Sequence, residues 1–404
     1  MTPATPPATR SGAAGTLDRP KAPLLYNPKV RGFVYQAALC AAIAFLAWSA
    51  IDNAIDNLAR ANLASGFGFW DQTAGFDISQ ALIAYTTTSS YGRAFWVGLL
   101  NTLLVAAIGI VLATVLGFAV GIARLSRNWL VARLAGFYVE TIRNVPLLLQ
   151  LLFWYNAVLK ALPGVRESLV IPGGGFLNNR GLFLPQPLPQ PEFRWTLAAL
   201  GIGVVAALAL QFWARRRQER TGAQAPMLWP VLALVGALPL AVFALSGLPL
   251  AFDYPESGRF NIRGGIEVLP EFMALLFGLS VYTAAFIAEV VRAGILSVVK
   301  GQTEAAYSLG LRPGPTLRLV VVPQAMRVIV PPLTSQYLNL TKNSSLAVAI
   351  GYPDLVQIFA GTVLNQTGQA VEVIAITMAV YLTISLVTSG LMNLYNRRVA
   401  VVER

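Results

Sequence analysis

The sequence contains no histidine and a single cysteine, Cys40. Histidine is the commonest general base and the commonest metal ligand, so its absence argues against ordinary acid–base catalysis and against a metal site. One cysteine cannot form an internal disulfide or a thiolate metal cluster. Because Cys40 lies in an apolar run, we expect it to be a small buried side chain.

Charge is also scarce. Charged residues make up 12% of the 404 residues, 56% are hydrophobic, and the mean hydropathy is +0.61. A soluble domain is about 25% charged, so this chain has too little charge to cover a water-facing surface, and we predict a multi-pass membrane protein. The net charge of +12 comes from basic residues in short clusters between apolar runs, which argues against a nucleic-acid partner.

The chain lacks a phosphate-binding loop of the form G-x-x-x-x-G-K-[ST], so we do not expect it to bind ATP in that way. Gly201, Gly203 and Ala206 imitate a dinucleotide fingerprint, but they lie in an apolar span, which favours helix packing through small residues. No nucleophile elbow is present, and without histidine no ordinary serine triad is available. We therefore expect no enzyme activity, no catalytic residue and no cofactor bound by this chain.

Apolar runs long enough to cross roughly 30 Å of hydrocarbon predict an all-α integral membrane fold with about eight transmembrane helices. Their approximate bounds are 33–51, 94–122, 134–162, 195–214, 227–248, 271–291, 324–350 and 371–394. Lys and Arg concentrate in the loops that lie inside when the N-terminus is cytoplasmic. The positive-inside rule therefore places both termini in the cytoplasm.

The predicted cytoplasmic loop at about 292–323 has an unusual composition. It contains Thr303-Glu304-Ala305-Ala306-Tyr307-Ser308-Leu309-Gly310, followed by Pro313 and Pro315. Thr303 can cap a short helix, Glu304 suits its first turn, and Gly310 is a natural helix stop. The two prolines force a turn before a second helix. Ala305 and Ala306 leave one helix face without bulk, which suits a groove on another protein; a helical hairpin on the membrane surface is the alternative.

The same loop resembles the cytoplasmic signature of the binding-protein-dependent ABC permeases. That signature is E-A-A, three residues, G, nine residues, I, one residue and L-P; here Glu304-Ala305-Ala306, Gly310, Val320, Val322 and Pro323 stand at the same spacing. In that family the loop is a coupling helix that docks on a cytoplasmic ATPase. The resemblance implies a type I importer (MetI-like) transmembrane domain. It also implies coupling to an ATPase dimer, which binds ATP, through Glu304, Ala305, Ala306, Gly310 and Pro323.

Three further stretches, 140–150, 282–294 and 339–346, resemble the polar-amino-acid branch of that family. The chain is longer than a minimal member of this family and has a proline-rich outer loop. In both respects it resembles the first of two paired permeases in general L-amino-acid importers. Those systems handle glutamate, glutamine, aspartate and asparagine. The resemblance implies a bacterial inner-membrane protein that works with a periplasmic amino-acid-binding protein, a second permease and the lipid bilayer.

The chain divides into four predicted parts. These are a disordered cytoplasmic tail (1–32), helices 1–3 with a first periplasmic loop (33–162), an insertion with a periplasmic loop and helices 4–5 (163–262), and helices 6–8 with the coupling loop (263–404). The outer loops 52–93 and 163–194 are long enough to contact a partner, although a hydrated linker would look the same.

Polar residues within a span are costly and face a cavity or one another. The substrate path is predicted to include Asn144, Gln150, Glu289, Asn339, Lys342, Asn343 and Ser344. Lys342 and Asn343 suit an amino-acid carboxylate and Glu289 suits its ammonium, with Pro331 and Pro332 kinking the helix. Lys342 can instead pair with a carboxylate such as Glu289 or Glu372 and hold helices together.

Glu140 and Arg143 lie at successive turns of one predicted helix, and an internal ion pair is the favoured interpretation of these two residues.

The predicted function is therefore a permease subunit that imports polar L-amino acids through ATP hydrolysis on a separate subunit. An ion-gradient-driven secondary transporter is the main alternative. A membrane scaffold that transports nothing is a third.

Overall fold

The structure is a computed structural model that describes residues 28–60, 66–223, 225–258 and 261–399. Most of the predicted disordered tail, residues 1–27, lies outside this range. The chain separates into two units, Met1–Ser65 and Gly66–Arg404. Each unit is described by itself.

The first unit contains helix α1 (Pro28–Arg60), whose stretch Arg31–Ala50 is long and apolar enough to cross a membrane. The helix begins before the predicted tail boundary at residue 32, because Pro28 can occupy the first helical position, where no amide donor is needed. Cys40 is exposed on α1. The prediction of a buried cysteine is therefore wrong, because this unit has no second described element to cover the helix.

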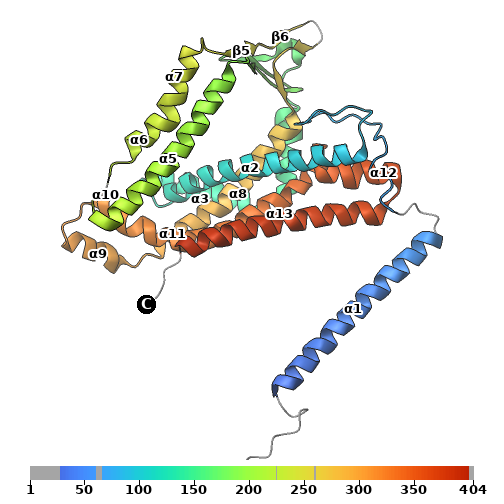
Figure 1. Ribbon diagram of the computed structural model, residues 1–404, viewed down its shortest axis with the longest axis horizontal. Helices are drawn as coiled ribbons and strands as arrows, with labels where there is room; N and C mark the ends of the chain where they lie inside the picture. The colour runs from blue at the N-terminus through green and yellow to red at the C-terminus, as the bar shows by residue number, and fades with distance from the viewer. Residues whose placement is uncertain (1–27, 61–65, 224, 259–260, 400–404) are drawn as a thin grey trace, which may run out of the picture. The chain divides into compact units, whose positions relative to one another are not determined.

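Four long helices form the bundle of the second unit (Figure 1). They are α2 (Tyr91–Ala123), α8 (Pro270–Leu296), α11 (Val322–Asn343) and α13 (Ala370–Val399). Helix α2 packs closely on α8 because Gly109, Ala113, Gly117 and Gly121 repeat every fourth residue and are all buried. A Cβ on Gly117 would lie 2.5 Å from Ile287 Cγ2.

The predicted third span, 134–162, is not one helix. It consists of α3 (Trp129–Asn144), α4 (Leu147–Leu152) and the π-helical segment η2 (Phe153–Leu159). Val145 is extended (φ −100°, ψ 127°) because Pro146 lacks an amide donor and disfavours helical geometry at the residue before it. Among the described residues, 7 helices, and not eight, are therefore long and apolar enough to span a membrane.

Helix α11 continues through Pro331 and Pro332, where the sequence predicts a kink, and is not interrupted at these prolines. Proline is tolerated within membrane helices because neighbouring groups satisfy the freed carbonyls. The helix changes at Ser344 into the 3₁₀ segment η6 (Ser344–Ile350), which ends at left-handed Gly351. The π-helical η7 (Val356–Val363) and α12 (Leu364–Thr367) then lead to α13.

The insertion contains a helical hairpin. Helix α5 (Phe193–Thr221) packs against a second arm made of α6 (Leu228–Leu232), η4 (Ala233–Ala237) and α7 (Leu238–Leu245). A Cβ on Gly203 would lie 2.0 Å from the Leu234 carbonyl oxygen. Gly203 of the dinucleotide-like pattern therefore serves helix packing, as predicted, whereas Gly201 is exposed.

The fold is mostly helical, as predicted, and short strands in and beside the insertion add to the helices. After the 3₁₀ turn η3 (Val165–Glu167), a four-stranded antiparallel sheet has the order β1 (Leu169–Ile171), β2 (Gly175–Asn178), β3 (Gly181–Leu184) and β8 (Ile266–Val268). Two strand pairs flank it: β4 (Gln186–Pro189) with β5 (Leu250–Asp253), and β6 (Glu256–Ser257) with β7 (Ile262–Arg263). The proline-rich run is thus partly a strand and not only a hydrated linker.

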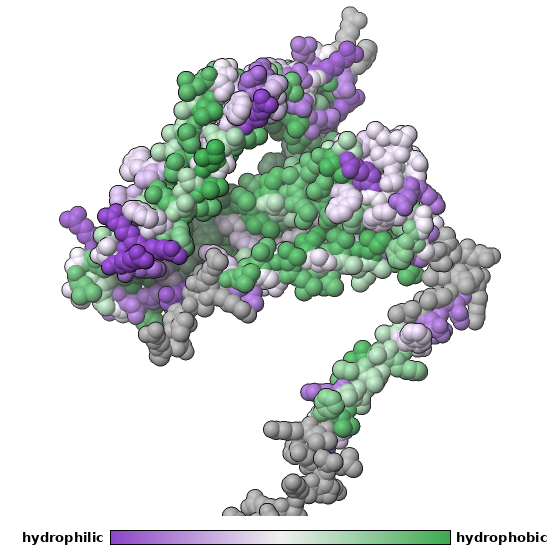
Figure 2. Space-filling model, viewed as in Figure 1, coloured by the Kyte–Doolittle hydropathy of each residue, from purple (hydrophilic) through white to green (hydrophobic). Residues whose placement is uncertain are grey.

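Residues 66–90 of the first outer loop pack onto the bundle. Phe69, Trp70 and Phe359 make edge-on or tilted ring contacts, and the Asn101 amide donates to the Gln80 carbonyl at 2.8 Å. Figure 2 shows polar residues gathered over the strands and around the far end of α5, with apolar surface between them. This distribution suits a bilayer crossed between two polar ends.

Candidate translocation path and coupling loop

The loop after α8 forms a short exposed helix, α9 (Lys300–Ser308), followed by α10 (Pro313–Thr316) and η5 (Leu317–Val321). Helix α9 ends at Ser308, and Gly310 follows its cap as the predicted helix stop. The Gly310 amide donates to Tyr307 O at 2.9 Å and the Leu311 amide to Ala306 O at 3.1 Å, and the φ of Gly310 is 78°. These bonds define a Schellman motif, which requires the left-handed conformation that glycine supplies.

The N-terminus of α9 differs from the prediction. The helix begins at Lys300 after an extended Val299, and no side chain caps it. Thr303 Oγ1 donates back to the Lys300 carbonyl at 2.6 Å, and Glu304 lies beyond the first turn. Thr303 is therefore not the cap, because its hydroxyl bonds backward within a helix that has already started.

Helix α9 presents one small residue inward and several apolar residues outward. Ala306 is buried, and α9 packs on α10 and η5. Glu304 and Ala305 are exposed, and Leu309 is 82% exposed. Pro323, at the start of α11, is also exposed. Figure 1 shows α9 and α10 at the end of the bundle where α13 ends. An exposed helix with an uncovered large apolar side chain is suited to a protein partner.

A pocket of about 360 Å³ between α8 and α11 is lined by two of the amide side chains predicted for the path, Asn339 and Asn343, and by the Gln336 amide; we call it the amide pocket. Tyr282, Thr283 and Phe286 line it from α8, and Gln336, Asn339 and Asn343 line it from α11. The three α11 residues share one helix face because they are spaced by three and four positions. Asn339 and Asn343 are therefore brought together, and their amides can donate to a carboxylate or accept from an ammonium group.

Lys342 lies at a different cavity from its neighbour Asn343. It lines a pocket of about 410 Å³ with Ser345 and with Thr377, Tyr381 and Ser385 of α13. Successive residues on a helix point about 100° apart, so one substrate carboxylate does not meet both side chains here. The predicted joint role of Lys342 and Asn343 does not fit this geometry.

Glu289 is bound by two arginines. Its carboxylate accepts hydrogen bonds from Arg124 and, at 3.2 Å, from Arg292 Nε. Glu372 accepts from the Gly66 amide. In the part of the chain that the structure describes, neither carboxylate pairs with Lys342, and Glu289 does not line the amide pocket. The predictions of a Lys342 ion pair with either residue, and of Glu289 as the ammonium acceptor, are therefore not supported.

Three other predicted path residues bond to the backbone. The Gln150 amide donates to Ile142 O and Val145 O, both at 2.9 Å, and so bridges the break between α3 and α4. The Asn144 amide donates to Glu140 O at 2.7 Å, and the buried Ser344 hydroxyl donates to Thr341 O at 2.7 Å. These side chains satisfy carbonyls at helix ends, which is a structural role.

Glu140 and Arg143 do not form the predicted internal pair within the described structure. The Arg143 guanidinium instead lies over the Phe286 ring, 5.0 Å from its centroid. Such a cation–π contact joins α3 to the amide pocket. Glu140 faces a separate cavity towards the other end of α3.

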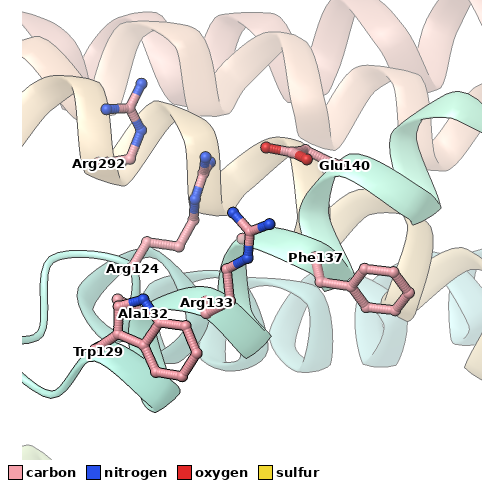
Figure 3. A pocket seen from close by; sticks show the side chains of 8 residues that line it. Arg124, Trp129, Ala132, Arg133, Phe137, Glu140 and Arg292 are labelled. Carbon is pink, nitrogen blue, oxygen red and sulfur yellow. The ribbon is translucent and has the colours of Figure 1, made fainter.

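Three arginines at that cavity were missed by the sequence reasoning. Figure 3 shows Arg124, Arg133 and Arg292 in a pocket of about 380 Å³ that Glu140 also lines; we call it the arginine pocket. The available signal was the stripe of Arg133, Glu140 and Arg143 on one face of α3. Arg292 lies far from Arg124 and Arg133 in the sequence, so its convergence on them could not be read from spacing.

The opposite end of the bundle has a pocket of mixed charge. Lys160, Arg180, Glu267 and Glu271 line a cavity of about 410 Å³ next to the sheet. Burial raises the pKa of the Glu267 carboxyl, and Arg180 opposes that shift. Tyr155 donates to Glu271 at 2.6 Å, and the Lys160 ammonium lies 4.3 Å from the centre of the Tyr155 ring.

The chain is similar to known transport proteins. The family model "Binding-protein-dependent transport system inner membrane component" matches residues 109–401. The chain is 53% identical over 380 residues to the general L-amino acid transport system permease protein AapQ of Rhizobium johnstonii, covering 94% of this chain and 95% of that protein. The putative amino-acid ABC transporter permease protein YhdX of Escherichia coli is also 53% identical, covering 94% of this chain and 96% of its own. The glutamate/glutamine/aspartate/asparagine transport system permease protein BztB of Rhodobacter capsulatus is 43% identical over 413 residues, with 94% and 96% covered.

Proposed function

We propose, from the premise that this chain belongs to the family of binding-protein-dependent transport system inner membrane components, that it forms the membrane path for acidic and amide L-amino acids. The chain is a multi-pass inner-membrane permease subunit of an ABC amino-acid importer, with a type I importer transmembrane domain. It is not an enzyme, because ATP hydrolysis belongs to a partner ATPase. The alternative of an ion-driven secondary transporter is not supported.

The relatives and the amide pocket support this substrate class. One relative is named for general L-amino acids and another for glutamate, glutamine, aspartate and asparagine. The amide pocket offers Asn339, Asn343 and Gln336, whose side chains can donate and accept hydrogen bonds. Neutral amides bind a zwitterion without holding a full charge in the membrane, so both neutral and acidic amino acids can pass.

One observation supports coupling of this chain to the ATPase: α9 is exposed, and Gly310 terminates it. Glu304, Ala305 and Leu309 are exposed there, at the position of the family's coupling motif. Ala306 is buried against the chain itself, so it packs inside the subunit. Ala305 is exposed and is the small side chain of α9 that can contact a partner. The partner ATPase receives this helix, and Pro323 starts the spanning helix that transmits its movement.

A permease of this family works with an ATPase and an external binding protein. The sheet and strand pairs of the insertion, beside the mixed-charge pocket, provide the surface for the binding protein. A second, different permease completes the path, a proposal that follows from the resemblance to paired importers. The chain itself needs no cofactor, since ATP is bound by the partner.

Reconstitution tests the proposed function. Proteoliposomes that contain this chain, the paired permease and the ATPase should take up labelled L-glutamate and L-glutamine only with ATP and the binding protein. Omission of any one component should reduce uptake to background. Uptake by this chain alone, without ATP and sensitive to an ion uncoupler, would overturn the proposal.

A further inference from the structure

The arginine pocket brings together groups from three parts of the bundle (Figure 3). Arg124 follows the end of α2, Arg133 projects from the second turn of α3, and Arg292 lies near the end of α8. Glu140 faces the same cavity from α3. The cavity measures about 380 Å³, so it can hold a small metabolite.

Its charges are only partly paired. Glu289 holds Arg124 and Arg292, whose guanidinium groups retain further N–H donors. Within the described residues the Arg133 guanidinium has no hydrogen-bond or ion-pair partner. Three guanidinium groups face two carboxylates, those of Glu289 and Glu140, so the pocket carries one excess positive charge. Such a site favours a ligand with one net negative charge.

The stripe on α3 connects this pocket to the amide pocket. Arg133, Glu140 and Arg143 share one face of α3, and Arg143 reaches Phe286 at the amide pocket. Arg133 and Arg143 lie about 15 Å apart along the axis, at 1.5 Å per residue. Ionisable residues on a membrane helix face a water-filled cavity and not lipid. The arginine pocket therefore lies in line with the path, towards the side where the ATPase docks.

We propose that the arginine pocket is an exit-side site that binds acidic amino acids, glutamate or aspartate, in the nucleotide-free transporter. Arg133 binds one carboxylate, the spare donors of Arg124 and Arg292 bind the other, and Glu140 accepts from the ammonium group. The site rests on the proposed function, because it acts on the transported substrate. Glu140 disfavours a phosphate dianion in the same cavity, which argues for a zwitterion over a lipid headgroup.

Equilibrium binding tests this site. The assembled permease pair and ATPase, without nucleotide or binding protein, is placed in nanodiscs of zwitterionic lipid and titrated with labelled L-glutamate or L-glutamine. Glutamate should bind about tenfold more tightly than glutamine, and Arg133→Gln should remove that preference. Arg127→Gln is the matched control, because Arg127 is exposed in the connection between α2 and α3 and does not line the pocket. The Arg127→Gln complex should bind glutamate with the same affinity as the unaltered complex.

A second variant separates the ammonium contact from charge alone. Glu140→Gln should weaken glutamate binding but leave glutarate, a dicarboxylate without an ammonium group, bound equally well or better. Unchanged glutamate binding in Arg133→Gln would overturn the site. Loss of glutamate binding when the nanodiscs contain phosphatidylglycerol would assign the pocket to a lipid headgroup instead. ATP-driven uptake in proteoliposomes with no such binding would reject this site alone, whereas absent uptake would reject the proposed function.

Discussion

Gly310 shows how a single residue can fix the shape of the coupling loop. Its φ of 78° suits glycine, whereas a side chain in the left-handed region costs about 1–2 kcal/mol. We expect Gly310→Ala to weaken ATPase attachment by roughly 5- to 30-fold, the factor that 1–2 kcal/mol represents, measured by pull-down of purified ATPase. Gly301→Ala is the control, since Gly301 lies within α9 with no atom near its Cβ position. Equal attachment in both variants would contradict the docking role.

The two neighbouring residues of α11, Lys342 and Asn343, allow a second test at this scale. Asn343→Leu removes the amide from the amide pocket, and we expect the uptake kcat/KM to fall about tenfold for the loss of one or two hydrogen bonds. Lys342→Met, in the other cavity, should change uptake less than twofold, because that cavity is lined by polar residues of α13 and not by those of the amide pocket. A larger loss of uptake in Lys342→Met than in Asn343→Leu would mean that the substrate passes along α13 instead.

The sequence could identify polar residue types at this scale but not their directions. Lys342 and Asn343 are adjacent in the chain and line different cavities. Glu289 suited an ammonium group in isolation, yet Arg124 approaches it from 165 residues away. Such partners depend on how the helices pack against one another. The spacing of residues along one helix carries no information about that packing.

Among the elements, the contact of α2 with α8 depends on the absence of side chains. A Cβ on Gly117 would lie 2.5 Å from Ile287 Cγ2 and 3.1 Å from the Ala284 carbonyl oxygen. We expect Gly117→Ala to destabilise the protein by about 1–3 kcal/mol through overpacking, seen as a lower Tm in detergent. Gly390→Ala on α13 makes the same change where no atom lies within 4 Å, and it should not lower the Tm. A normal Tm for Gly117→Ala would mean that the two helices separate easily.

Hydropathy predicted the long elements because each spanning helix needs about 20 apolar residues. It failed at 134–162, where Pro146 divides the run and the Gln150 amide bonds to the freed carbonyls. Pro146 indicated a break in the helix, but a hydropathy window averages over many residues and does not detect a single proline. The strands were missed because they have two to four residues each, too short for an alternating pattern to appear.

At the scale of the whole molecule, we propose that the two polar ends of the second unit bind different partners. The exposed α9 lies at one end, and the strands of the insertion lie at the other (Figure 1). The positive-inside rule predicts that α9 is cytoplasmic and that the strands are periplasmic. This orientation decides whether the ATPase and the binding protein can reach their surfaces.

Cysteine labelling measures that orientation directly. In a Cys40→Ala background, Ala305→Cys on α9 should react with an impermeant maleimide only after the inner membrane is opened. Val170→Cys on β1, where the side chain is 74% exposed, should react in spheroplasts without opening. Bound ATPase should also protect Ala305→Cys but not Gly314→Cys on the adjacent α10, because a docked helix loses solvent access on its outer face. Labelling of Ala305→Cys from the outside would separate α9 from any cytoplasmic ATPase, and the importer could not be driven through this loop.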